Sequence, residues 1–122
     1  MVFMTRFLGP DLKARGAGKS AIINMTSAYS ARPVSNMPIY SSAKSFEDVW
    51  SQNLWYENQE MDILTVQNMP TKSARSPLGV NPAETVEGVM SDLGQERLSY
   101  GHANHSLMRH WILFQQSQKY FN

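Results

Sequence analysis

The chain has 122 residues, 42% of them apolar, and a formal net charge of +1 at pH 7. These values are typical of one small globular domain and give no reason to expect a nucleic acid or an acidic surface as partner. The absence of cysteine excludes disulfides and thiolate metal sites, and no apolar run is long enough for a membrane span.

The first segment with a recognisable pattern is residues 2–12, whose loosely helical apolar spacing predicts a helix or a frayed terminus. The following Gly16-Ala17-Gly18-Lys19-Ser20 resembles the end of a phosphate-binding loop. That motif needs a glycine at position 13, where Lys13 stands, and a strand before the loop. Here the apolar strand pattern, residues 20–25, comes after it. The glycine-rich segment is therefore interpreted as a turn between a helix and a strand.

Three polar residues follow this strand in an arrangement that suggests acid–base chemistry. Ser27 comes directly after the strand, and Tyr40 opens a predicted helix over residues 39–58. Lys44, four positions further on, lies on the same helical face as Tyr40. An ammonium close to a phenol favours the phenolate, which suits a general acid or base near neutral pH. The spacing predicts proton transfer to or from a carbonyl or alcohol oxygen held by Ser27, although the same spacing also arises by chance.

The helix over residues 39–58 has apolar side chains at positions 46, 49, 50 and 54, a stripe that predicts burial against a core. A second apolar segment, residues 62–69, is the next predicted strand. Two strands joined by a helix predict a right-handed βαβ unit with parallel strands. Ligands of such sheets bind at the carboxyl ends of the strands, where Ser27 and Pro70 are expected.

The last third of the chain predicts two further helices. Asn81, Pro82 and Glu84 form a helix start, and Gly94 is a plausible stop. Residues 96–102 are interpreted as a turn and residues 106–118 as a helix. Three histidines in this region, His102, His105 and His110, have no carboxylate or cysteine among them, so solvent-facing or cavity-lining histidines are expected rather than a metal site.

Three segments of the chain carry a family pattern: Asn-Met-Thr-Ser at residues 24–27, Tyr-Ser-Ser-Ala-Lys at residues 40–44 and Val-Gln-Asn-Met-Pro at residues 66–70. With these segments the chain resembles the short-chain dehydrogenase/reductase family. Within that family the chain looks most like the branch of 3-oxoacyl-CoA reductases and 17-beta-hydroxysteroid dehydrogenases. The resemblance implies an α/β fold, the C-terminal portion of a Rossmann-like doubly wound parallel sheet with flanking helices. Residues 1–122 would form a single partial domain that lacks the N-terminal dinucleotide-binding half.

The resemblance also implies a reaction, reduction of a carbonyl group with a nicotinamide cofactor. Tyr40 would donate the proton, Lys44 would hold the nicotinamide ribose, and Ser27 would bind the carbonyl oxygen. Further cofactor contacts are expected from Pro70 and Thr71. The cofactor would be NADP, which proteins of this branch usually use, with NAD as the alternative.

The expected substrate is a lipid, either a 3-oxoacyl-CoA of fatty acid elongation or a ketosteroid. Its apolar contacts would be Tyr29, Met37 and Ile39; alternatively, these are incidental hydrophobic residues of a surface loop. The family further implies a homodimer through the helix that starts at Tyr40. It also implies a location on the cytosolic face of the endoplasmic reticulum, or in the cytoplasm if the chain is complete as given.

Three departures from the family pattern support a second hypothesis. The chain has no glycine-rich dinucleotide fingerprint, no asparagine before Asn24 for the proton relay, and about four residues fewer than usual between Pro70 and Thr71. A catalytically silent fragment or degenerate paralogue with a structural or pairing role would account for them.

Overall fold

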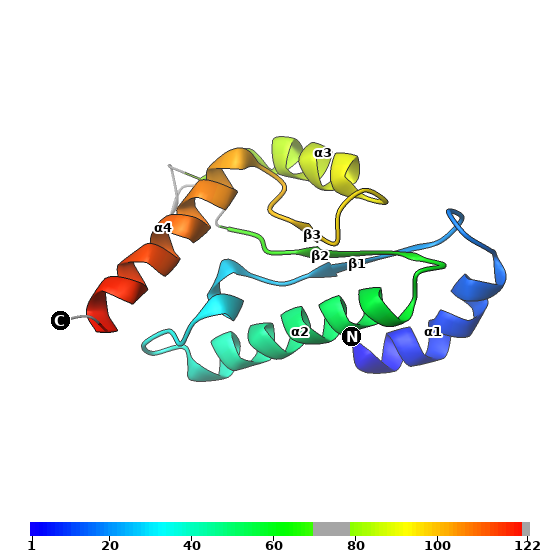
Figure 1. Ribbon diagram of the computed structural model, residues 1–122, viewed down its shortest axis with the longest axis horizontal. Helices are drawn as coiled ribbons and strands as arrows, with labels where there is room; N and C mark the ends of the chain where they lie inside the picture. Colours follow the sequence, from blue (N-terminus) through cyan, green and yellow to red (C-terminus); the bar gives the residue numbers. More distant parts are fainter. Residues whose placement is uncertain (70–78, 121–122) are drawn as a thin grey trace.

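The computed structural model describes residues 1–69 and 79–120 of the chain. The described elements, in chain order, are α1 (Val2–Ala14), β1 (Ala21–Met25), the 3₁₀ helix η1 (Ala28–Ala31), α2 (Pro38–Glu57), β2 (Asp62–Val66), α3 (Pro82–Asp92), β3 (Leu98–Ser99) and α4 (Ala103–Tyr120). Parallel strands covered by helices make this an α/β fold, as the sequence predicts (Figure 1).

The sheet has the order β1-β2-β3 and is parallel throughout. Its register pairs Met25 with Val66 and Val66 with Ser99. The third strand corrects the prediction of a turn over residues 96–102, because a strand of two residues is too short to show a periodic pattern. The second predicted strand is also shorter than expected and ends at Val66 rather than at residue 69.

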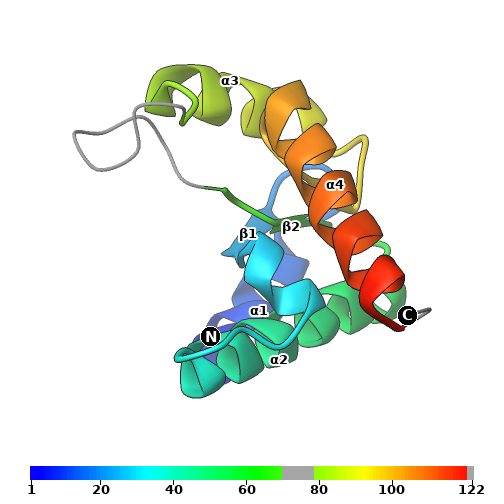
Figure 2. The same cartoon turned by 90° about the vertical axis from the view of Figure 1, so that its left-hand side faces the viewer.

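Helices cover both faces of the sheet, with α1 and α2 on one side and α3 and α4 on the other (Figures 1 and 2). Such covering explains why β2 is buried almost along its whole length, as is usual for a central parallel strand. Its Leu64 and Val66 form the apolar core together with Val89 of α3, and Leu93 packs against them.

The inner face of α2 is polar, which corrects the prediction of an apolar stripe against the core. The buried residues of α2 are Ser41, Asp48 and Ser51, whereas Phe46 and Val49 are 56% and 59% exposed. The small serines allow the helix to approach the sheet closely, and Asp48 and Ser51 bond to polar partners on the strands or just past their ends, while Ser41 bonds to the start of its own helix. Ser51 Oγ, for example, accepts hydrogen bonds from Asn24 Nδ2 at 2.9 Å and Thr65 Oγ1 at 2.7 Å.

The third helix begins at its predicted cap, since the Asn81 side chain accepts a hydrogen bond from the Ala83 amide at 3.1 Å. It packs closely against the chain after β3. A Cβ atom built on Gly88 would lie 2.0 Å from the carbonyl oxygen of Gly101. Glycine at position 88 is therefore required for α3 to lie at this distance.

The last helix starts earlier than predicted and buries a histidine. Leu107 and Trp111 are 69% and 60% exposed, while His105 is 0% exposed and its Nδ1 lies 3.0 Å from the carbonyl oxygen of Tyr100. The expectation that all three histidines face solvent or a cavity is therefore wrong for His105. Within residues 1–69 and 79–120, no three metal-binding side chains cluster and no helix is long and apolar enough to cross a membrane.

Candidate active site

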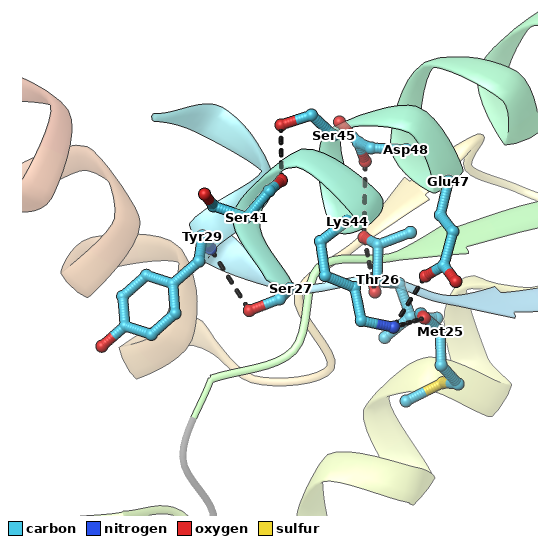
Figure 3. Close-up of polar contacts among 10 residues, drawn as sticks. Met25, Thr26, Ser27, Tyr29, Ser41, Lys44, Ser45, Glu47 and Asp48 are labelled. Carbon is cyan, nitrogen blue, oxygen red and sulfur yellow. Dashed lines mark hydrogen bonds and ion pairs between the residues drawn. The ribbon is translucent and has the colours of Figure 1, made fainter. Parts of the chain in front are cut away.

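Ser27 lies where β1 ends and is held by backbone pairing that continues past the strand. The amide of Thr26 donates to Val66 O at 2.7 Å, and the amide of Ala28 donates to Asn68 O at 3.1 Å. The Ser27 side chain caps η1 and accepts a hydrogen bond from the Tyr29 amide at 3.2 Å (Figure 3). Because that contact uses a lone pair, the hydroxyl hydrogen of Ser27 stays free to donate to a ligand.

A pocket of about 330 Å³ brings Ser27 and Tyr40 together at the carboxyl end of the sheet. Tyr40 lies in the first turn of α2, just after Pro38, which is well suited to a helix start. The other residues lining this pocket, here called the Ser27–Tyr40 pocket, are Thr26, Tyr29, Met37, Asn68 and Met69. Tyr29 and Met37, which the resemblance implies as substrate contacts, thus line the same pocket as Ser27 and Tyr40. Ile39 is not among the lining residues and is 86% exposed.

Lys44 lies beside Tyr40, with its Nζ 6.0 Å from the centre of the Tyr40 ring. Its hydrogen-bond partners are the carbonyl oxygen of Met25 at 3.1 Å and Oε2 of Glu47 at 2.7 Å (Figure 3). The bond to Met25 ties the lysine to the end of β1, next to Ser27. This anchoring places the ammonium, paired with Glu47, at the end of β1, and Lys44 itself is not among the residues that line the Ser27–Tyr40 pocket.

A buried carboxylate on α2, Asp48, lies one helical turn beyond Lys44. Its oxygens accept hydrogen bonds from Gln67 Nε2 at 2.9 and 3.0 Å, and from Thr26 Oγ1 at 3.4 Å. Gln67 in turn accepts a hydrogen bond from Arg109 Nε of α4 at 2.6 Å. Helix α2, the two strand ends and α4 are thus linked by one polar network directly behind Ser27.

The site predicted from the sequence does not include this network, although the sequence contains one feature that indicates it. Asp48 continues the four-residue spacing of Tyr40 and Lys44, so its carboxylate could have been assigned to the same helical face. No comparable pattern indicated Gln67 or Arg109, whose contacts depend on how α4 returns to the sheet.

The donors at the Ser27–Tyr40 pocket fit the reactive end of a nicotinamide reaction. Ser27 and Tyr40 supply two hydroxyl groups and Lys44 supplies an ammonium beside them, which suits a carbonyl oxygen and the hydroxyls of a ribose. The two remaining predicted cofactor contacts, Pro70 and Thr71, lie outside the described residues.

Comparison with known proteins shows which proteins the chain is similar to. No family model matches the chain. The very-long-chain 3-oxoacyl-CoA reductases of Bos taurus and Mus musculus are 31% and 32% identical to it over 113 residues. A solved short-chain dehydrogenase from Burkholderia cenocepacia, in complex with NADP, superposes with a TM-score of 0.76 at 20% identity and over 94% of this chain. These matches support a member of the short-chain dehydrogenase/reductase family.

The chain spans only part of the length of the proteins that it matches. It covers 36% of the length of the Bos taurus and Mus musculus reductases and 52% of the Burkholderia chain. A second solved structure, from work on a 7beta-hydroxysteroid dehydrogenase, superposes on this chain with a TM-score of 0.67 at 18% identity. The match covers 88% of this chain and 44% of that chain. Both solved structures support the Rossmann-like sheet.

Proposed function

We propose that this chain is the catalytic part of a nicotinamide-dependent reductase that acts on a 3-oxoacyl-CoA. The observation that carries the proposal is the convergence of Ser27 and Tyr40 on one pocket, with the ammonium of Lys44 6.0 Å from the Tyr40 ring. The names of the Bos taurus and Mus musculus relatives support the substrate class. A ketosteroid is the competing substrate, supported by the 7beta-hydroxysteroid dehydrogenase neighbour.

In this proposal each side chain acts on the carbonyl oxygen of the substrate. When bound, the nicotinamide supplies the hydride that reduces the carbonyl carbon. Ser27 donates its free hydroxyl hydrogen to the oxygen and orients it towards Tyr40. Tyr40 then gives its phenolic proton to the same oxygen, and the charge on Lys44 stabilises the phenolate that remains.

The proposal extends to cofactor choice and location. NADP is the proposed cofactor, supported by its presence in the Burkholderia structure, with NAD as the alternative. Pro70 and Thr71 would complete its binding site. The cytosolic face of the endoplasmic reticulum is the proposed location, on the basis of the family branch. Residues 1–122 would form part of one domain of this kind.

A homodimer through α2 is also proposed. The outer face of this helix presents Ile39, Phe46 and Val49, which are 86%, 56% and 59% exposed. Covering such side chains would remove apolar surface from water. Light scattering should show a dimer for the chain and a monomer for Phe46→Glu combined with Val49→Glu. An unchanged mass in that double variant would contradict the dimer.

Turnover of NADPH with a 3-oxoacyl-CoA tests the reductase proposal. The Tyr40→Phe variant should lose activity by about 10²–10⁴-fold, because it removes the proton donor. Tyr56→Phe is the control, since Tyr56 is exposed and lies at the far end of α2. Absence of turnover in the folded chain, or equal activity of Tyr40→Phe, would favour the alternative of a catalytically silent chain with a structural role.

A further inference from the structure

A second pocket, of about 480 Å³, lies beside the Ser27–Tyr40 pocket and is here called the Arg32 pocket. Its lining residues come from η1, from the loop after it and from the first turns of α2: Ser30, Ala31, Arg32, Pro33, Val34, Pro38, Ser41, Ser42 and Ser45. Residues adjacent in the chain line the two pockets, since Tyr29 and Tyr40 line one of them and their neighbours Ser30 and Ser41 line the other.

Arg32 is the single charged residue among the nine that line this pocket. Within the described part of the chain its guanidinium has no hydrogen-bond or ion-pair partner, and its Nε atom is buried. A buried donor on a charged group costs free energy when it is unpaired. The guanidinium fork matches the oxygens of a phosphate or carboxylate, so an anionic group would remove this cost.

Two further features of the pocket favour an anion. Ser30 is 8% exposed and its Oγ has no hydrogen-bond partner among residues 1–69 and 79–120. The amino end of α2, a helix of 20 residues, contributes Pro38 and Ser41 to the lining and has neither an acidic residue in its first turn nor a side-chain cap. The partial positive charge of a helix start is therefore not neutralised by any side chain of its own first turn.

Two other serines of the pocket already use their hydroxyl groups within the protein. Ser41 Oγ donates to Met37 O at 3.1 Å and to Pro38 O at 3.3 Å, and Ser45 Oγ donates to Ser30 O at 2.6 Å. The bond from Ser45 ties η1 to α2. The donors left for a ligand are the guanidinium of Arg32 and the hydroxyls of Ser30 and of the exposed Ser42.

We infer that the Arg32 pocket binds a phosphate of the coenzyme A carrier while the keto group of the substrate lies at Ser27 and Tyr40. This inference rests on the proposed function and narrows it to a phosphate-bearing acyl thioester. A steroid has no anionic group for Arg32, whereas the apolar Ala31, Pro33 and Val34 suit the uncharged arm that joins a thioester to its phosphates.

The test is a binding titration of the full chain, followed by NMR at the Arg32 Nε–H and the Ser30 amide. Coenzyme A should shift both signals and should bind at least tenfold more tightly than pantetheine, which has the same arm without phosphate. Arg32→Ala should weaken coenzyme A binding by about tenfold or more, because a charge-assisted bidentate contact is lost. Arg32→Lys should recover only part of the affinity, since lysine lacks the fork.

Arg15→Ala is the matched control, because Arg15 is exposed and follows α1 near the opposite end of β1. Equal weakening by Arg15→Ala and Arg32→Ala would overturn the inference, as would equal affinity for coenzyme A and pantetheine. Binding of inorganic phosphate without binding of coenzyme A would overturn the assignment to a carrier. The titration measures binding without turnover, so it tests this site separately from the reductase proposal. Arg32-dependent binding of coenzyme A in a chain without reductase activity would refute the reductase proposal and still support this site.

Discussion

The ammonium nitrogen of Lys44 lies 6.0 Å from the centre of the Tyr40 ring, one helical turn along α2. The spacing of the two residues in the sequence predicted this proximity. It did not predict that Lys44 would be bonded to Met25 O and Glu47, which fix the lysine at the end of β1. The position of the charge beside Tyr40 therefore depends on contacts outside the Tyr40–Lys44 pair.

The two partners of Lys44 should contribute unequally to stability. The side chains of Lys44 and Glu47 are 23% and 27% exposed, so their ion pair is partly screened by water. Glu47→Gln should lower the free energy of unfolding by less than about 1 kcal/mol. Lys44→Ala should cost more, about 1–2 kcal/mol, because the Met25 carbonyl also loses its donor. Urea denaturation measures both, and a larger loss in Glu47→Gln than in Lys44→Ala would contradict this ranking.

Asp48 should be much more important for stability than its neighbour Glu47. The carboxylate of Asp48 is the acceptor for Thr26 and Gln67, and the residue is 8% exposed. Asp48→Ala should lower the free energy of unfolding by about 2–4 kcal/mol, because buried donors lose their partner. Glu47→Ala is the control on the same helix and should cost less than about 1 kcal/mol. Similar unfolding midpoints for the two variants would refute a structural role for the network.

Two glycines in helices should respond differently to the same substitution. A Cβ on Gly88 would lie 2.0 Å from Gly101 O, a backbone atom that cannot rotate away, whereas a Cβ on Gly9 of α1 would meet nothing within 4 Å. Gly88→Ala should therefore cost at least about 2–3 kcal/mol or prevent folding. Gly9→Ala should change stability by less than about 1 kcal/mol. Thermal unfolding followed by circular dichroism would compare them, and a harmless Gly88→Ala would show that α3 can move away from Gly101.

One exposed ion pair should give a small dependence of stability on pH. Lys13 lies 2.9 Å from Glu60, and the hydrogen bond from Lys13 holds the pKa of the Glu60 carboxyl below its ordinary value of 4.5. A lowered pKa in the folded state means that the contribution is present above pH 4.5 and is lost as the pH falls through the folded value. Glu60→Gln should thus be slightly less stable than the parent chain at neutral pH. Urea midpoints that differ more in acid than at pH 7 would contradict this sign.

The order of elements could be predicted from local pattern. The continuous apolar run before Ser27, the capping residues from Asn81 and the helical spacing after Tyr40 each depend on neighbours close in sequence, and each gave the right kind of element. The strand Leu98–Ser99 could not be found in this way. Two residues show no period, and they form a strand only because β2 presents a free edge to them.

The sequence by itself determined the proposed acid–base residues, because Tyr40 and Lys44 are related by one helical turn and Ser27 by the end of a strand. Only the tertiary structure decided which face of α2 is buried. Asp48 and Ser51 are buried because polar partners on the strands satisfy them, while the more apolar Phe46 and Val49 remain exposed. Hydrophobic periodicity reflects how strongly each side chain favours burial. It does not show which polar partners a buried side chain will find, because those partners come from residues distant in the chain.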